Sequence, residues 1–201
     1  MDQMLTLRTP DGIVMTYFDA TRPRTDPMVC VNILRLFYHY SRGMDPSLRA
    51  TKDWVHQVLL NFAYIHGTRY YTSPDVFLYY VSKLVQENPG SDICRAIVPL
   101  LTSRLRARVN ADGDSIALAM RIIACQALGI PDELDLQKLL SLQSEDGGWE
   151  VGWLCCTGKR GIRIGNRGVA TALAIHAIES MTSLTNIGLQ MGVGTFWRNS
   201  V

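Results

Sequence analysis

The sequence has 201 residues, of which 47% are hydrophobic and 19% are charged. These values are typical of a folded globular chain with a sizeable apolar core. The net charge of +2, without a basic stripe between aromatics, argues against a nucleic-acid partner. No apolar run reaches the roughly 18 residues that a membrane span requires, and Met1–Arg8 does not resemble a signal peptide. We therefore expect a cytoplasmic protein without a transmembrane segment, with its five cysteines as reduced thiols.

Apolar-periodic segments alternate with turn signals along the chain. Residues 1–25 contain Pro10, Asp11-Gly12 and Pro23, and predict an irregular lead-in. The longer helices are expected to begin near Asp26, Ser73, Gly113 and Asn166, with shorter ones near 47–66, 91–109 and 134–142. Pro99 predicts a kink or the start of a new helix. The last helix should end near Met181, and the tail at 182–201 is expected to be weakly ordered.

The longer helices recur about every 40 to 50 residues, which is the size of a helical-hairpin repeat. No pair of strands is expected. The pattern predicts a single all-α domain over residues 1–201, with about seven helices in helical hairpins. Inner and outer helices that alternate in this way form an α/α toroid or a solenoid. An irregular helical bundle is the alternative.

A sharp reversal is predicted between Leu142 and Trp153, because Asp146-Gly147-Gly148 readily adopts positive φ angles. We expect the Gln143 amide to cap a helix end and the Trp149 indole to pack back over the turn. The spacing Gln143-x3-Gly147-x-Trp149 resembles the repeat motif of squalene–hopene cyclases and class II terpene cyclases. The resemblance extends over most of the chain through four successive units: Tyr17 with Asp26-Pro27, Gly67 to Leu84, Asp112 to Ile123, and Gln143 to Ile178.

The chain thus resembles the terpenoid cyclase and protein prenyltransferase superfamily, whose barrel usually has six inner and six outer helices. The resemblance implies an α/α toroid. About seven helices cannot close such a ring, so we expect a partial barrel. Either the open side is capped, or two copies complement each other in a homodimer.

Asp112-Gly113-Asp114-Ser115 resembles the Asp-x-Asp-Asp motif of class II terpene cyclases. The resemblance implies that Asp114 is the proton donor and Asp112 the first acidic position, while Ser115 replaces the last Asp. An isolated Asp is ionised at neutral pH, so burial or a neighbouring carboxylate such as Asp112 must keep it protonated. The alternative is that Asp112 or Asp114 is an ordinary helix cap.

Aromatic residues lie beside the turns that precede the predicted inner helices: Tyr17, Phe18, Tyr70, Tyr71, Trp149 and Trp153. In a toroid these turns gather at one rim, so the rings could line the mouth of a pocket and stabilise a carbocation. Packing corners are the alternative. Asn166 and Arg167 are expected to position a polar group of the substrate. They end a basic, glycine-rich stretch, Lys159–Gly168, which is either an anion site for diphosphate or carboxylate or a solvated loop.

No metal site and no cofactor are expected. Asp92-Ile93-Cys94 has the spacing of the zinc ligands in protein prenyltransferases, but it begins an outer helix, and no Asp-Asp-x-x-Asp motif occurs. The sequence therefore predicts a cyclase for a hydrophobic terpenoid or polyene-derived substrate. Ring closure would be proton-initiated or pericyclic, as in an intramolecular Diels–Alder reaction. The alternative function is a non-catalytic helical-repeat module that binds a protein or a peptide.

Overall fold

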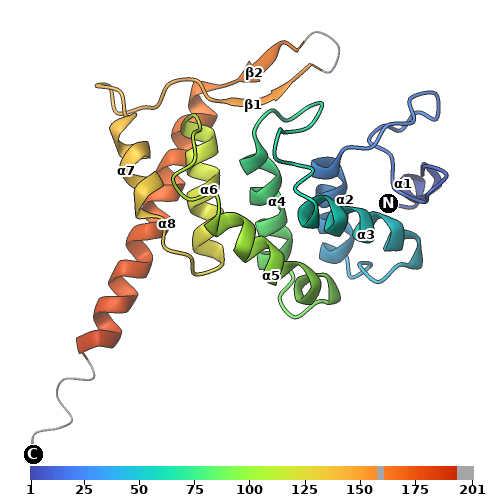
Figure 1. The fold of residues 1–201 in the computed structure, drawn as a ribbon, viewed down its shortest axis with the longest axis horizontal. Helices are drawn as coiled ribbons and strands as arrows, with labels where there is room; N and C mark the ends of the chain where they lie inside the picture. The colour runs from blue at the N-terminus through green and yellow to red at the C-terminus, as the bar shows by residue number, and fades with distance from the viewer. Residues whose placement is uncertain (158–160, 194–201) are drawn as a thin grey trace, which may run out of the picture.

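The computed structural model describes residues 1–157 and 161–193, with side chains described up to residue 181. The described chain is mostly helical, which confirms the all-α prediction (Figure 1). Its helices are α1 (Asp2–Thr6), α2 (Pro27–His39), α3 (Arg49–Leu60), α4 (Pro74–Glu87), α5 (Asp92–Arg106), α6 (Ser115–Ala127), α7 (Glu133–Ser141) and α8 (Arg167–Val193). A short 3-10 turn, η1 (Pro46–Leu48), precedes α3.

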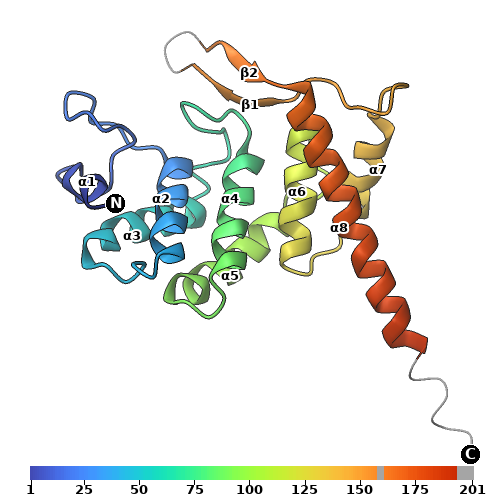
Figure 2. The ribbon, with the colours of Figure 1, turned by 180° about the vertical axis from the view of Figure 1, so that it is seen from behind.

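The helices form two layers that alternate along the chain. α2, α4, α6 and α8 lie side by side in one row, and each packs against the next (Figure 2). The second layer holds α3, α5 and α7, which pack against α2, α4 and α6 respectively. This is the predicted alternation of inner and outer helices. Within the described residues the row is open, so closure into a ring and a homodimer both stay predictions.

The four inner helices begin at capping side chains that local sequence predicts. Asp26 accepts from the amides of Met28 and Val29, and Ser73 accepts from that of Asp75. Asp114 and Asn166 cap α6 and α8 in the same way. The four helices run in the same direction, so these caps lie at one edge of the molecule, at the top of Figure 1. We call this edge, defined by the four caps, the upper rim.

α6 is the central helix of the fold. Every residue from Ser115 to Cys125 is buried. On one side α6 faces α8, which presents the small side chains Ala170, Ala174 and Ala177 and so allows close approach. On the other side it packs against α4. The packing of α6 therefore fixes the position of Asp114, the residue that caps its amino-terminal end.

The prediction that no strands pair is wrong. β1 (Trp153–Cys156) and β2 (Arg163–Gly165) form an antiparallel two-stranded sheet. The strands are only four and three residues long and glycine-rich at their ends, so they carry no alternating pattern. Just before β1, Gly152 lies against α6, where an added Cβ would be 2.6 Å from Ile116.

Several predicted boundaries also differ. α3 ends at Leu60, and Phe62 has a φ of 56°, which breaks the helix before the expected end at His66. Pro99 lies inside α5, so no new helix begins there.

The two ends of the chain contain more structure than predicted. The lead-in contains α1 and an isolated bridge between Arg8 and Val14, although it was expected to be irregular. α8 continues to Val193, and the remainder of the predicted tail, residues 194–201, lies outside the described residues.

Within the described part of the chain, no helix combines the length and the hydropathy needed to cross a bilayer. The cysteines at positions 30, 94, 125, 155 and 156 are all free thiols.

Candidate active site

The hairpin of β1 and β2 crosses the upper rim (Figure 1). At one end of β1, the backbone N–H of Trp153 donates to Oδ2 of Asp114 at 2.8 Å. At the other end, the backbone N–H of Cys156 donates to the carbonyl of Tyr70 at 2.8 Å. β1 therefore bridges the start of α6 and the loop that precedes α4.

Asp114 uses both carboxylate oxygens. Oδ1 accepts from the backbone N–H of Ala117 at 3.0 Å, and Oδ2 accepts from Trp153. Asp112 is exposed, whereas Ser115 is buried and its hydroxyl donates to the carbonyl of Glu150 at 3.3 Å. Asp114 is thus the cap of α6 and also an anchor for the hairpin. Its role as an acid and the supporting role of Asp112 stay predictions.

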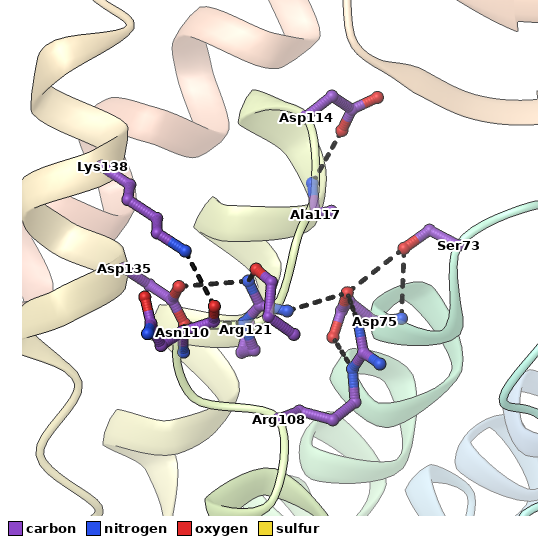
Figure 3. Close-up of polar contacts among 10 residues, drawn as sticks. Ser73, Asp75, Arg108, Asn110, Asp114, Ala117, Arg121, Asp135 and Lys138 are labelled. Carbon is purple, nitrogen blue, oxygen red and sulfur yellow. Dashed lines mark hydrogen bonds and ion pairs between the residues drawn. The ribbon is translucent and has the colours of Figure 1, made fainter.

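A buried ion cluster fixes α6 below Asp114 (Figure 3). Arg121, on α6, has no exposed side-chain surface. Its Nε lies 2.7 Å from Oδ2 of Asp135 on α7, and its Nη1 lies 3.3 Å from Oδ2 of Asp75 on α4. Arg108, just after α5, pairs with Oδ1 of Asp75 at 2.7 Å. Through Arg121, this cluster therefore ties the middle of α6 to α4 and α7.

Sequence reasoning missed this cluster, because its members are far apart along the chain. The available signal was one Arg in the apolar run from Ile116 to Ala127, where a cation must be paired if it is buried.

Asp132 adds a further carboxyl group to this cluster. It is fully buried and caps α7, with Oδ1 accepting from the N–H of Asp135 at 3.3 Å. Its Oδ2 has no hydrogen-bond partner among the described residues. Burial, and then the carboxylate of Asp135, raise the pKa of Asp132 to about 7. With Asp132 protonated, Arg108 and Arg121 balance the charges of Asp75 and Asp135.

Of the predicted aromatic corners, Tyr17 and Tyr70 contact each other, and a gathering of all the rings at one rim stays a prediction. The hydroxyl of Tyr17 donates to that of Tyr70 at 2.7 Å, and the two rings meet edge to face. Tyr71 is half-buried, and burial, followed by the nearby Asp26, raises its pKa to about 12. Trp153 is 36% exposed. Contact of Tyr17, Tyr71 and Trp153 with a substrate stays a prediction.

Trp149 lies beneath the rim and is only 1% exposed. Its indole N–H donates to the carbonyl of Leu139 at 2.7 Å, and its backbone N–H donates to the Thr171 hydroxyl at 3.1 Å. The side chain therefore packs as a corner, and a contact with substrate stays a prediction. The Gln143 amide donates to the carbonyl of Gly147 at 2.9 Å. It closes the turn itself, so the predicted cap on a helix end is wrong.

Asn166 and Arg167 are both engaged within the protein. Oδ1 of Asn166 accepts from the N–H of Val169 at 3.1 Å and caps α8. The guanidinium of Arg167 binds the two oxygens of Asp146 at 2.5 and 2.7 Å, beside an open hollow of about 520 Å³. Their role in positioning a substrate stays a prediction. Lys159 and Arg160, from the predicted anion-binding stretch, lie outside the described residues.

Among the described side chains, no group of three or more His, Cys, Asp or Glu could hold a metal ion. Asp92 accepts from Nζ of Lys52 at 2.9 Å, and the thiol of Cys94 donates to the carbonyl of Asn88 at 2.8 Å. Asp92 thus links α5 to α3, and Cys94 links α5 to the end of α4, so both side chains serve contacts between helices.

Two comparisons relate the chain to known proteins. Residues 1–40 match a family model described as the sesquiterpene cyclase astC-like C-terminal domain. The chain is also 44% identical, over 190 residues, to drimenol cyclase drtB of Aspergillus calidoustus. Both matches bear the names of terpenoid cyclases. The second alignment covers 94% of this chain and 36% of the relative, so the chain spans about a third of that protein's length. No solved structure matches the chain.

Proposed function

We propose that the chain belongs to the catalytic part of a terpenoid cyclase, which closes rings in a linear isoprenoid after protonation by Asp114. The observation that carries the proposal is the placement of the Asp112–Ser115 motif. The motif begins the central helix α6, and Asp114 binds the backbone N–H of Trp153, one of the aromatic residues that would line the pocket with Tyr17 and Tyr71. The similarity to a sesquiterpene cyclase family and to a drimenol cyclase supports the same reaction class.

In the proposed reaction, the Asp114 carboxyl group transfers its proton to one carbon of an alkene. The π electrons form the new C–H bond and leave a carbocation on the other carbon. A second alkene of the same molecule then supplies the electrons of a new C–C bond, and loss of a proton ends the sequence as a net isomerisation. The carboxylate left on Asp114 is held by the N–H groups of Ala117 and Trp153. Aromatic faces at the rim stabilise the cation.

Asp114→Asn tests the assignment while retaining a capping side chain. With linear C15 isoprenoid alcohols and their phosphate esters as substrates, we expect cyclic product to fall by at least about 100-fold, because the general acid is lost. Product is measured by gas chromatography with mass spectrometry. Asp45→Asn, at the cap of η1, is the matched control and should retain activity.

Full cyclisation by the Asp114→Asn variant would contradict protonation by this residue. It is the result expected of a pericyclic closure, which needs no acid. A module that only binds a protein or a peptide would form no cyclic product with either variant or with the unmodified chain.

A further inference from the structure

The segment that leads into β1 is hydrogen-bonded to the start of α6. The hydroxyl of Ser115 donates to the carbonyl of Glu150 at 3.3 Å. Three residues further along, the backbone N–H of Trp153 donates to Oδ2 of Asp114 at 2.8 Å. Two consecutive residues at the start of α6 therefore hold the two ends of this short segment.

Gly152, within this segment, allows the backbone to come close to α6. A Cβ added at Gly152 would lie 2.6 Å from Cγ1 of Ile116, which is much closer than non-bonded carbon atoms approach. Ile116 is only 1% exposed and is packed in the core, so it has no room to move away. An added Cβ at Gly165, on β2, would likewise collide with the carbonyl oxygen of Gly152. A side chain at position 152 would therefore push the next peptide N–H, that of Trp153, away from Asp114.

The two carboxyl oxygens of Asp114 have different environments. Oδ1 accepts from the backbone N–H of Ala117 at 3.0 Å, which is the bond of an ordinary helix cap (Figure 3). Oδ2 is not needed for capping, and it accepts from a residue that is distant in sequence, Trp153. A hydrogen bond to an ionised oxygen is stronger than one to a neutral oxygen, so the bond from Trp153 strengthens as Oδ2 loses a proton. A donor that binds the developing charge more tightly than the neutral acid lowers the barrier to proton transfer.

We propose that Oδ2 of Asp114 delivers the proton, and that Gly152 is a positioning residue that holds the N–H of Trp153 on this oxygen. The inference rests on the proposed function, because it concerns the acid assigned there. In the step, the Oδ2–H bond breaks as the alkene carbon takes the proton, and the bonding electron pair stays on Oδ2. The N–H of Trp153 stabilises the charge that forms there. The indole of Trp153 takes no part in this bond, so the backbone and the side chain can be tested separately.

Two substitutions at Trp153 separate the N–H from the side chain. Trp153→Ala removes the indole and keeps the N–H, whereas Trp153→Pro removes both, and proline is tolerated at the first residue of a strand. Single turnover of a linear C15 isoprenoid, with the full chain in saturating excess, gives a rate constant that does not depend on the fraction of protein that is folded. We expect this rate constant to be at least about tenfold lower for Trp153→Pro than for Trp153→Ala, because one donor to the developing charge is lost. Equal rate constants for the two variants would overturn the proposal.

Gly152→Ala tests the positioning residue in the same assay. Its rate constant should also fall by at least about tenfold, because the added Cβ displaces the Trp153 N–H from Asp114. Gly90→Ala, between α4 and α5, is the matched control. Gly90 has a φ of 78° and no atom within 4 Å of an added Cβ, so alanine strains the backbone there without moving α6. Equal rate constants for Gly152→Ala and Gly90→Ala would overturn the role of Gly152.

Asp114→Asn separates this inference from the assignment of the acid. If Asp114→Asn loses cyclisation while the two Trp153 variants turn over at the same rate, Asp114 remains the acid and the role of the Trp153 N–H is overturned. Full cyclisation by Asp114→Asn would overturn both. Loss of cyclisation in Asp114→Asn, with a slower Trp153→Pro than Trp153→Ala, is the expected result.

Discussion

At the scale of single residues, Asp132 has the most unusual chemistry in the structure. It is fully buried beside Asp135, and its pKa is raised to about 7 from an ordinary value of 3.8. Between these two values the folded protein holds a proton that the unfolded chain has released. The free energy of unfolding therefore falls as pH rises from about 4 to 7, and stays low above that range. Burial of Asp132 beside Asp135 therefore destabilises the fold only when the Asp132 carboxyl group is ionised.

Asp132→Asn keeps a capping side chain and removes the titration. We expect the variant to exceed the unmodified chain in unfolding free energy by roughly 1–3 kcal/mol at pH 8, and to differ little at pH 4. Urea unfolding followed by circular dichroism at the two pH values measures this difference. Asp45→Asn, at a partly exposed cap whose pKa is lowered, should show no gain at pH 8. A variant that is less stable than the parent at pH 8 would show that Asp132 is held as an anion.

At the scale of elements, α6 contains a buried cation, Arg121, whose charge is balanced by carboxylates of other helices. Arg121 binds Asp135 of α7 through two nitrogens, at 2.7 and 3.1 Å, and also reaches Asp75 of α4. Removing the guanidinium leaves the Asp135 carboxylate buried without its cation. Such a loss is costly even where the intact pair adds little net stability.

Arg121→Met should therefore lower the free energy of unfolding by about 3–5 kcal/mol, although the replacement fills a similar volume. Arg35→Met removes one partner of the partly exposed pair with Glu87 and should cost under about 1 kcal/mol. Thermal unfolding of the two variants compares them. A loss no larger for Arg121→Met than for Arg35→Met would mean that the cluster does not hold α6.

The elements also show what sequence can predict here. Asp26-Pro27 and Ser73-Pro74 place a capping oxygen before a proline, so the starts of α2 and α4 are encoded within a few residues. The Arg121 cluster joins residues far apart in the chain, and β1 is held by backbone hydrogen bonds to Asp114 and to Tyr70, which are also distant in sequence. Such non-local contacts have no local pattern from which to predict them.

The candidate site likewise contains features that the local sequence predicts and features that it does not. The motif at Asp112–Ser115 predicted the position of Asp114 at the start of an inner helix. The turn pattern predicted that the rings gather at one rim, and the contact of Tyr17 with Tyr70 agrees with it for these two rings. The structure also contains an open cleft lined by Arg22, Arg24 and Arg69, which was not predicted because residues of two separate loops line it.

At the scale of the whole molecule, the inner row of α2, α4, α6 and α8 is open, and its four amino-terminal ends face one rim (Figure 2). The proposed acid, Asp114, and the backbone of Trp153 that donates to it lie at that rim. The chain spans about a third of the drimenol cyclase to which it is similar, so the matched relative has further segments.

Cyclisation in D2O tests most directly whether a proton from the protein starts the reaction. The Asp114 carboxyl group exchanges with solvent, so a proton-initiated reaction transfers deuterium to the alkene carbon. Mass spectrometry of the cyclic product should then show one deuterium per molecule, bound to carbon. A cyclic product with no deuterium on carbon would contradict protonation as the first step.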